Sequence, residues 1–349
     1  MSKNIPVNNE KLQEIANQFP TPFYLYDEKA IRENAQKLKK AFGILPGFKE
    51  YFAVKGLPNP FILKILADEG FGGDCSSLPE VMLCEKAGIT GEDIMFTSNE
   101  TPASEYQYAH EQGSIINLDD ISHIDFLKKS LGEFPALISF RYNPGPLKEG
   151  NAIIGKPEEA KYGLTHDQII EAFGKAKELG STRFGLHTMV ASNELENDYF
   201  VETARLLYEI AVELKAQYDI TLEFINMGGG IGIPYRPDQK AVDYDYVAKG
   251  VKAEYDRIIA NNPLFEKGTE IKFFMECARV ITGPYGYLVT KAIHEKHIYR
   301  DYIGVDACMA DLMRPGMYGA YHDITVSGIE SAVPTVTSDF VGSLCENCD

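Results

Sequence analysis

A lysine and a glutamate each end a run of apolar residues, a position from which a charged side chain can take part in chemistry. Lys55 follows Tyr51-Phe-Ala-Val, and Glu276 follows Phe273-Phe-Met. A lysine that is partly removed from water has a lowered pKa and can form a Schiff base with a carbonyl group. A glutamate in such surroundings is costly to bury unless a partner stabilises its charge. Taken alone, Lys55 could equally extend into solvent, and Glu276 could pair with Arg279 to close the fold.

Three further features would suit an anionic or flat ligand. Gly228, Gly229 and Gly230 are consecutive, and such a run exposes backbone N–H groups that bind an anion, typically phosphate. Arg279 supplies guanidinium donors for a carboxylate or a phosphate. His187 ends another apolar run, and its ring could stack on a flat ligand or carry protons. Taken singly, the glycines could form a bare turn and His187 could be a structural histidine.

Eight short apolar runs alternate with helical patterns over about 250 residues, the usual size of a (β/α)8 barrel. The runs cover residues 48–55, 70–76, 94–99, 114–119, 136–143, 183–189, 223–229 and 271–279, and helical patterns begin at 60, 78 and 165 or cover 198–217 and 244–260. An open doubly wound sheet is the main alternative, but eight units are many for it. Lys55 and Glu276 also fall at carboxyl ends of strands, where barrels carry their chemistry. We therefore predict an α/β fold with a (β/α)8 TIM barrel over residues 28–283.

Beyond residue 283 the sequence changes to β runs separated by turns, without helical patterns. The runs cover residues 286–289, 297–306, 323–326 and 335–341, and the run at 23–26 could pair with them. We predict a mainly β domain from residues 1–27 and 284–349. The chain stops at Asp349 shortly after a strand, which would leave an unpaired edge. We therefore expect the sequence to be a fragment whose β domain is incomplete.

Composition narrows the class of protein. The chain has 349 residues, of which 44% are hydrophobic, and its 51 acidic and 34 basic residues give a net charge of −17. This charge argues against general nucleic-acid binding, because such a chain repels phosphate backbones. No apolar run of about 18 residues occurs, which argues against a membrane-spanning helix. Six sparse cysteines favour a reduced, cytoplasmic setting, and Cys345-Glu-Asn-Cys348 has no second half that would complete a metal site.

The predicted barrel brings the candidate residues into one pocket. Barrels often bind phosphate at the loops after strands seven and eight, where the glycines and the turn from Glu276 to Arg279 fall. Closure makes the eighth strand a neighbour of the first, so Glu276 and Lys55 flank one pocket. A phosphate nest, a Schiff-base lysine and a buried carboxylate together describe a site for pyridoxal 5′-phosphate (PLP). Lys55 would hold the aldehyde, and Glu276 would keep the pyridine nitrogen protonated so that the ring accepts electrons.

From about Pro22 to its last residue, the chain resembles the diaminopimelate decarboxylases, which are fold type III (alanine-racemase-like) PLP enzymes. The matching motifs are Tyr51-Phe-Ala-Val-Lys55, His187, Gly228-Gly-Gly230, Glu276-Cys-Ala-Arg279, Asp311-Leu-Met-Arg314-Pro-Gly-Met-Tyr318 and Val341-Gly-Ser-Leu-Cys345-Glu346. The resemblance implies that the cofactor contacts Lys55, His187, Gly228, Gly229, Gly230, Glu276, Cys277, Ala278 and Arg279. Cys277 and Ala278 stand where the family usually has Pro-Gly, and Ala278 keeps a backbone N–H for the phosphate.

The same resemblance implies a substrate and an assembly. Arg279, Arg314 and Tyr318 would bind the carboxylate at the non-reacting end of the substrate, and Glu346 would contact its distal ammonium group. Cys345 would reprotonate the carbanion after CO2 leaves. In the family, Cys345 and Glu346 reach into the partner subunit's site, so a homodimer is implied. The implied reaction converts meso-2,6-diaminopimelate to L-lysine and CO2 in lysine biosynthesis.

Three alternatives remain open. The nearest is a decarboxylase of another basic amino acid, such as ornithine, or of a carboxylated polyamine; Arg314 and Tyr318 favour instead a substrate with a second carboxylate. A racemase of the same fold would usually place an arginine at the pyridine nitrogen, and Glu276 argues against it. A non-catalytic PLP-binding homologue would show cofactor absorbance without turnover.

Overall fold

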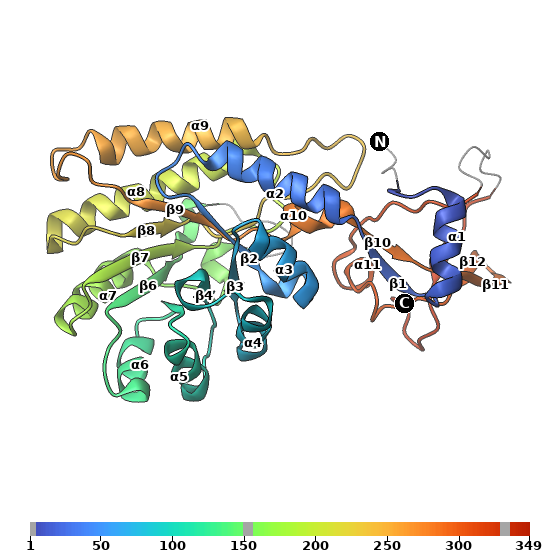
Figure 1. The fold of residues 1–349 in the computed structure, drawn as a ribbon, viewed down its shortest axis with the longest axis horizontal. Helices are drawn as coiled ribbons and strands as arrows, with labels where there is room; N and C mark the ends of the chain where they lie inside the picture. The colour runs from blue at the N-terminus through green and yellow to red at the C-terminus, as the bar shows by residue number, and fades with distance from the viewer. Residues whose placement is uncertain (1–4, 149–155, 329–335) are drawn as a thin grey trace. The chain divides into compact units, whose positions relative to one another are not determined.

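The computed structural model describes residues 5–148, 156–328 and 336–349, and the chain forms two compact units (Figure 1). The barrel unit consists of Lys29–Ile233 and Lys240–Pro284. The β unit consists of Met1–Glu28, Pro234–Gln239 and Tyr285–Asp349, three stretches that are distant in sequence. Within the described ranges, no helix combines the length and the apolar character needed to cross a membrane.

The barrel unit contains eight parallel strands that close in the order β2-β3-β4-β5-β6-β7-β8-β9 (Figure 1). They are β2 (Lys49–Ala53), β3 (Gly72–Cys75), β4 (Ile94–Phe96), β5 (Ile115–Leu118), β6 (Leu137–Tyr142), β7 (Arg183–Thr188), β8 (Phe224–Asn226) and β9 (Lys272–Met275). The barrel closes where β2 pairs with β9, with Glu50 opposite Met275. Each strand lies within one of the eight predicted runs, so the barrel is confirmed and the open sheet was the wrong alternative.

Helices connect these strands and begin at local sequence signals. They are α2 (Glu28–Phe42), α3 (Pro60–Asp68), α4 (Leu78–Ala87), α5 (Ala103–Glu111), α6 (His123–Leu131), α7 (His166–Glu178), α8 (Asn197–Tyr218), α9 (Tyr244–Tyr255) and α10 (Arg279–Thr282). The Asn59 side chain caps α3 ahead of its first-turn proline, and Thr165 and Gln168 form a capping box at α7. The predicted helix over 244–260 differs in one respect: α9 ends at Tyr255 and continues as a π-helical turn, Asp256–Ala260.

Large side chains fill the barrel interior. A buried cluster consists of Tyr51, Met95, Ile115, Phe224 and Phe274. The rings of Phe224 and Phe274 stack with their centroids 4.5 Å apart. Gly185 on β7 leaves room for them, because a Cβ at this position would overlap the Phe224 ring. The interior is therefore a packed core, and ligands must bind at the ends of the strands.

Ion pairs connect the amino ends of the strands. Arg183 at the start of β7 donates to Glu223 at 2.6 Å and to Glu92 at 2.5 Å. Lys272 at the start of β9 also donates to Glu223, at 3.1 Å. The hydrogen bonds from Arg183 are the main reason why the pKa values of Glu92 and Glu223 lie below their usual range. This network therefore stabilises the fold only while both carboxyls are ionised.

Replacing Arg183 by methionine is expected to lower the free energy of unfolding by about 1 kcal/mol at pH 7, since solvent screens part of the network. A carboxyl whose pKa is lower in the folded protein stabilises the fold above its unfolded pKa, and this stabilisation is lost as pH falls through the folded pKa. The deficit of the variant should therefore be full above about pH 5 and shrink below about pH 4. Urea unfolding of wild type and variant, above about pH 5 and below about pH 4, measures this deficit in unfolding free energy.

The matched control for this prediction is Arg205→Met, which removes an exposed pair with Glu209 on α8. It should change the unfolding free energy by only a few tenths of a kcal/mol, about the value of such a pair. If the Arg183 deficit were the same at both pH values, the carboxyl pairs would not be its cause.

The β unit contains two small sheets within its described residues. β1 (Phe23–Tyr26) pairs antiparallel with β10 (Gly286–Val289), which confirms the predicted pairing of the run at 23–26. In the second sheet, β12 (Asp301–Val305) pairs antiparallel with β11 (Ala292–His297) and parallel with β13 (Asp339–Val341). The helices of this unit are α1 (Asn9–Gln18) and α11 (Arg314–Tyr318).

The structure corrects three predictions for the β unit. Residues 323–326 do not form a strand, and Ile324 and Val326 are exposed because no strand among the described residues pairs with them. The predicted run 297–306 is divided, since β11 ends at its first residue and β12 begins four residues later. The pattern predicts no helix in this region, yet α11 forms with a proline in its first turn and ends at Gly319, whose φ is 59°. Residue 335 of the predicted run 335–341 lies outside the described residues.

Candidate active site

Lys55 and Glu276 follow two strands that are neighbours in the barrel. Lys55 lies in the 3-10 turn Val54–Gly56 directly after β2 and is exposed. Glu276 directly follows β9 and is 6% exposed. Because β2 and β9 are parallel and paired, both residues lie at the carboxyl edge of the barrel, on either side of the pairing that closes it. A cationic and an anionic group therefore flank the seam at which the barrel closes.

Two buried partners from neighbouring strands hold the Glu276 carboxylate. His187 Nε2 on β7 lies 2.9 Å from Oε2, and Asn226 Nδ2 on β8 donates to Oε1 at 2.6 Å. Burial by itself would raise the pKa of Glu276, but the charge and hydrogen bond of His187, helped by the charge of Lys55, hold it below its usual value. Glu276 is therefore a fixed negative charge that can pair with a cationic ring nitrogen.

A second buried acid, Asp74 in β3, acts at the same edge. It is 4% exposed, and its Oδ1 has no hydrogen-bond partner among the described residues. Burial, followed by the negative charge of Glu276, raises the pKa of Asp74 well above its usual range, while Lys55 opposes this shift. The pKa values of two nearby carboxyls are thus shifted in opposite directions, a pattern typical of catalytic sites.

The three glycines form a tightly packed turn after β8. Gly228 and Gly230 have φ values of 70° and 97°, a region that favours glycine. A Cβ on Gly229 would overlap the carbonyl oxygen of Glu276, and one on Gly230 would lie 2.5 Å from the Ala191 carbonyl oxygen. The turn must therefore be formed by residues without side chains. Such a turn exposes its backbone N–H groups and suits a phosphate group.

Arg279 lies three residues after Glu276, in the segment that follows β9. It is the first residue of α10, after Cys277 and Ala278. Its Nη2 donates to Ser192 Oγ at 3.4 Å, which joins the segments that follow β9 and β7. The guanidinium group is thus anchored at the same edge as the glycines.

The remaining predicted site residues, Arg314, Tyr318, Cys345 and Glu346, lie in the β unit. The Arg314 guanidinium lies over the Tyr235 ring, 4.6 Å from its centroid, and its Nη1 lies 3.0 Å from His322 Nε2. Tyr318, Cys345 and Glu346 are exposed. The predicted cofactor residues are thus gathered at one edge of the barrel unit, and the predicted distal-substrate residues other than Arg279 belong to the β unit.

Three buried polar residues outside the predicted site complete it, and for one of them, Asp74, the sequence already indicates polar contacts to a ligand. Asn226 bonds Glu276, Asp74 adds a second acid, and Arg141 on β6 forms an ion pair with Asp119 at 3.3 Å. Each of these residues interrupts or ends an apolar strand run. That interruption was the available signal, because a polar residue inside a buried strand needs a partner.

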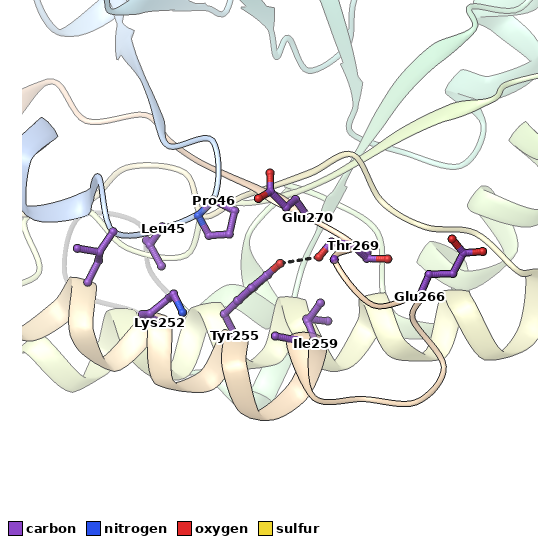
Figure 2. A pocket seen from close by; sticks show the side chains of 11 residues that line it. Leu45, Pro46, Lys252, Tyr255, Ile259, Glu266, Thr269 and Glu270 are labelled. Carbon is purple, nitrogen blue, oxygen red and sulfur yellow. Dashed lines mark hydrogen bonds between the residues drawn. The ribbon is translucent and has the colours of Figure 1, made fainter.

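A hollow of about 370 Å³ lies at the other edge of the barrel, and Figure 2 shows residues that line it. Pro46 and Glu270 on its rim precede β2 and β9, and the Tyr255 hydroxyl donates to the Thr269 carbonyl oxygen at 3.1 Å. Lys55 and Glu276 follow those strands instead of preceding them. The hollow is therefore separate from the candidate active site.

The fold and the site together define the class of protein. Residues 28–283 match the family described as pyridoxal-dependent decarboxylase, pyridoxal binding domain. The chain belongs to this family. It is a PLP-dependent amino-acid decarboxylase acting on a small molecule, which confirms the cofactor and the enzyme class predicted from the sequence.

Relatives are similar to nearly the whole chain. Protein TabA of Pseudomonas amygdali pv. tabaci is 38% identical over 338 residues, which are 97% of this chain and 77% of TabA. The diaminopimelate decarboxylase of Methanothermobacter thermautotrophicus is 33% identical over 340 residues, 96% of this chain and 78% of the relative. The crystal structure of diaminopimelate decarboxylase from Helicobacter pylori complexed with L-lysine has a TM-score of 0.82 and 28% identity, covering 97% of this chain and 82% of that one.

Proposed function

We propose that this chain decarboxylates meso-2,6-diaminopimelate to L-lysine and CO2, a reaction of lysine biosynthesis. The observation that carries the proposal is the buried Glu276 side chain, which His187 and Asn226 hold beside the strand that leads to Lys55. The similarity to diaminopimelate decarboxylases supports the choice of substrate. Arg314 supports it further, because a second carboxylate on the substrate requires a cationic partner.

The residues at the carboxyl edge of the barrel fit PLP. His187 Nδ1 and Asp74 Oδ1 are buried and have no hydrogen-bond partner among the described residues. Lys55 would bind the aldehyde, Glu276 the ring nitrogen and His187 the ring face. The phosphate would be held by Gly228, Gly229, Gly230, the backbone N–H of Ala278, and Arg279, whereas the predicted contact from Cys277 is not supported because its N–H is donated to Glu50. When bound, PLP supplies an electron sink for the pair of electrons left by the departing CO2.

The chain's own residues orient the reaction. Glu276 holds a proton on the ring nitrogen, and its charge is in place before the reaction begins, which is a major source of catalytic power. Arg279, Arg314 and Tyr318 would bind the distal carboxylate, and Glu346 the distal ammonium group. The Cys345 thiol would deliver the proton that replaces CO2.

We also propose an assembly and a location. By the resemblance, Cys345 and Glu346 act in the partner subunit's site, and the active form is then a homodimer. A biosynthetic decarboxylase with sparse, unpaired cysteines fits the cytoplasm.

CO2 release from diaminopimelate, ornithine, lysine and arginine tests the proposed substrate. We expect the highest kcat/KM on diaminopimelate. Arg314→Met should raise the KM for diaminopimelate by about tenfold to a hundredfold, since it removes a charge-assisted hydrogen bond. Arg236→Met is the matched control, because Arg236 lies over the Tyr321 ring in the same unit. A preference for ornithine, or cofactor absorbance without turnover on any amino acid, would contradict the proposal.

A further inference from the structure

The backbone of Glu276 and Cys277 is fixed by three contacts. The Glu276 N–H donates to the Gly228 carbonyl oxygen at 2.8 Å. The Glu276 carbonyl oxygen packs so closely on Gly229 that a Cβ there would overlap it. The Cys277 N–H donates to Oε1 of Glu50. The third contact brings in a side chain that neither the sequence motifs nor the proposed mechanism uses.

Glu50 lies on β2, five residues before Lys55, and faces away from the interior cluster that contains Tyr51. It is 1% exposed, and its Oε2 has no hydrogen-bond partner among the described residues. Burial raises the pKa of Glu50 well above its usual range, although the hydrogen bond from the Cys277 N–H opposes the shift. Burying a carboxyl group in this way costs stability, because one of its oxygens loses water without gaining a partner. Such a cost at the closing seam points to a function.

The identity of residue 277 explains why an acceptor is needed. Cys277 has a backbone N–H, which a proline at this position would lack. This donor would be unsatisfied in the interior without Glu50. The next residue shows a similar adjustment. A Cβ on Gly56, directly after Lys55, would lie 2.6 Å from the Ala278 Cβ, so glycine at 56 makes room for alanine at 278.

We propose that Glu50 is a positioning residue, whose hydrogen bond to the Cys277 N–H fixes the Glu276 carboxylate relative to Lys55. This inference rests on the proposed role of Glu276 at the cofactor ring. Glu50 does not touch the reacting atoms. It acts through the backbone of Cys277, and its effect is to fix the position of the Glu276 carboxylate.

Two substitutions of Glu50 in the PLP-loaded enzyme test this role. Glu50→Gln keeps an oxygen acceptor, and its kcat should stay within about threefold of wild type. Glu50→Leu leaves the Cys277 N–H without an acceptor, and kcat should fall about tenfold to a hundredfold with little change in KM. The cofactor absorbance, followed as a function of pH, should change in the leucine variant and be retained in the glutamine variant. A leucine variant with the wild-type kcat and absorbance profile overturns the proposal.

A double-mutant cycle separates positioning from a general loss of packing. Cys277→Pro alone deprives Glu50 of its donor, and combined with Glu50→Leu it removes both partners of the hydrogen bond. We expect the double variant to be more stable to urea, without cofactor, than Glu50→Leu, and to recover the wild-type absorbance profile with cofactor. A double variant no more stable than the weaker single variant overturns the proposal, even if the leucine variant does not fold.

Asn117→Leu on β5 is the matched control for a polar-to-leucine change at a buried position of a barrel strand. Asn117 is buried and accepts a hydrogen bond from Ser139, so its loss should lower stability. The cofactor absorbance profile should not change. The cofactor absorbance and the stability to urea can be measured without knowing the substrate. A failure of the enzyme to turn over diaminopimelate would therefore be distinguishable from a failure of the Glu50 proposal.

Discussion

Lys55→Ala is expected to abolish CO2 release and to remove the absorbance that the linkage between Lys55 and PLP gives the purified protein. The amine is the only group proposed here to bind the cofactor covalently, and alanine has no nucleophile to replace it. The loss of kcat should be on the order of 10³-fold or more. Absorbance spectroscopy of the purified variant, together with a CO2 assay, measures both effects.

Lys49→Ala provides the matched control on the same strand. Lys49 begins β2 at the other edge of the barrel and forms an ion pair with Asp93. Its removal should leave both the absorbance and the turnover in place. An unchanged spectrum in Lys55→Ala would show that another residue holds the cofactor.

Glu276→Gln is expected to lower kcat by about 10²-fold to 10³-fold. Glutamine has nearly the same shape, so the barrel should fold. Its amide has no negative charge to hold a proton on the ring nitrogen, and the electron sink is weakened. Steady-state kinetics and the cofactor absorbance measure the change. Glu92→Gln, at the amino edge of the barrel, is the control and should retain turnover.

The pH dependence of the Glu276 variant has a defined sign. His187 and Lys55 hold the pKa of Glu276 below its usual value, so the wild-type carboxylate stays ionised from about pH 5 upwards. The ratio of wild-type to variant kcat should therefore be constant between about pH 5 and pH 8. If the ratio of wild-type to variant kcat fell towards one as the pH approached about 5, Glu276 would be gaining its proton within this range, which would contradict the prediction.

The barrel could be predicted from sequence because its signals are local. Each strand is a short apolar run, and three helices, α3, α7 and α9, begin at a side-chain cap. The order of runs, with charged residues at their carboxyl ends, was enough to predict closure. The predicted contacts of Lys55, His187 and Arg279 with PLP remain proposals for experiment.

The partners of Glu276 and the details of the β unit could not be predicted in the same way. Asn226 and Glu50 gain their roles from strand pairing between distant segments, which no local pattern records. The run at 323–326 has β-branched residues, but a strand also needs a neighbour, and no strand in the described part of the chain pairs with it. α11 is only five residues long, too short for a periodic pattern.

The seam between β2 and β9 has a consequence for synthesis of the protein. Glu50 and Cys277 are 227 positions apart, so a ribosome needs roughly 10 to 45 s to make the second after the first. During this time one edge of β2 lacks its neighbour and is open to pairing with other nascent chains. Lys49 and Glu50 place two charges on that edge. The carboxyl that is buried in the finished barrel would thus act earlier as a gatekeeper against aggregation.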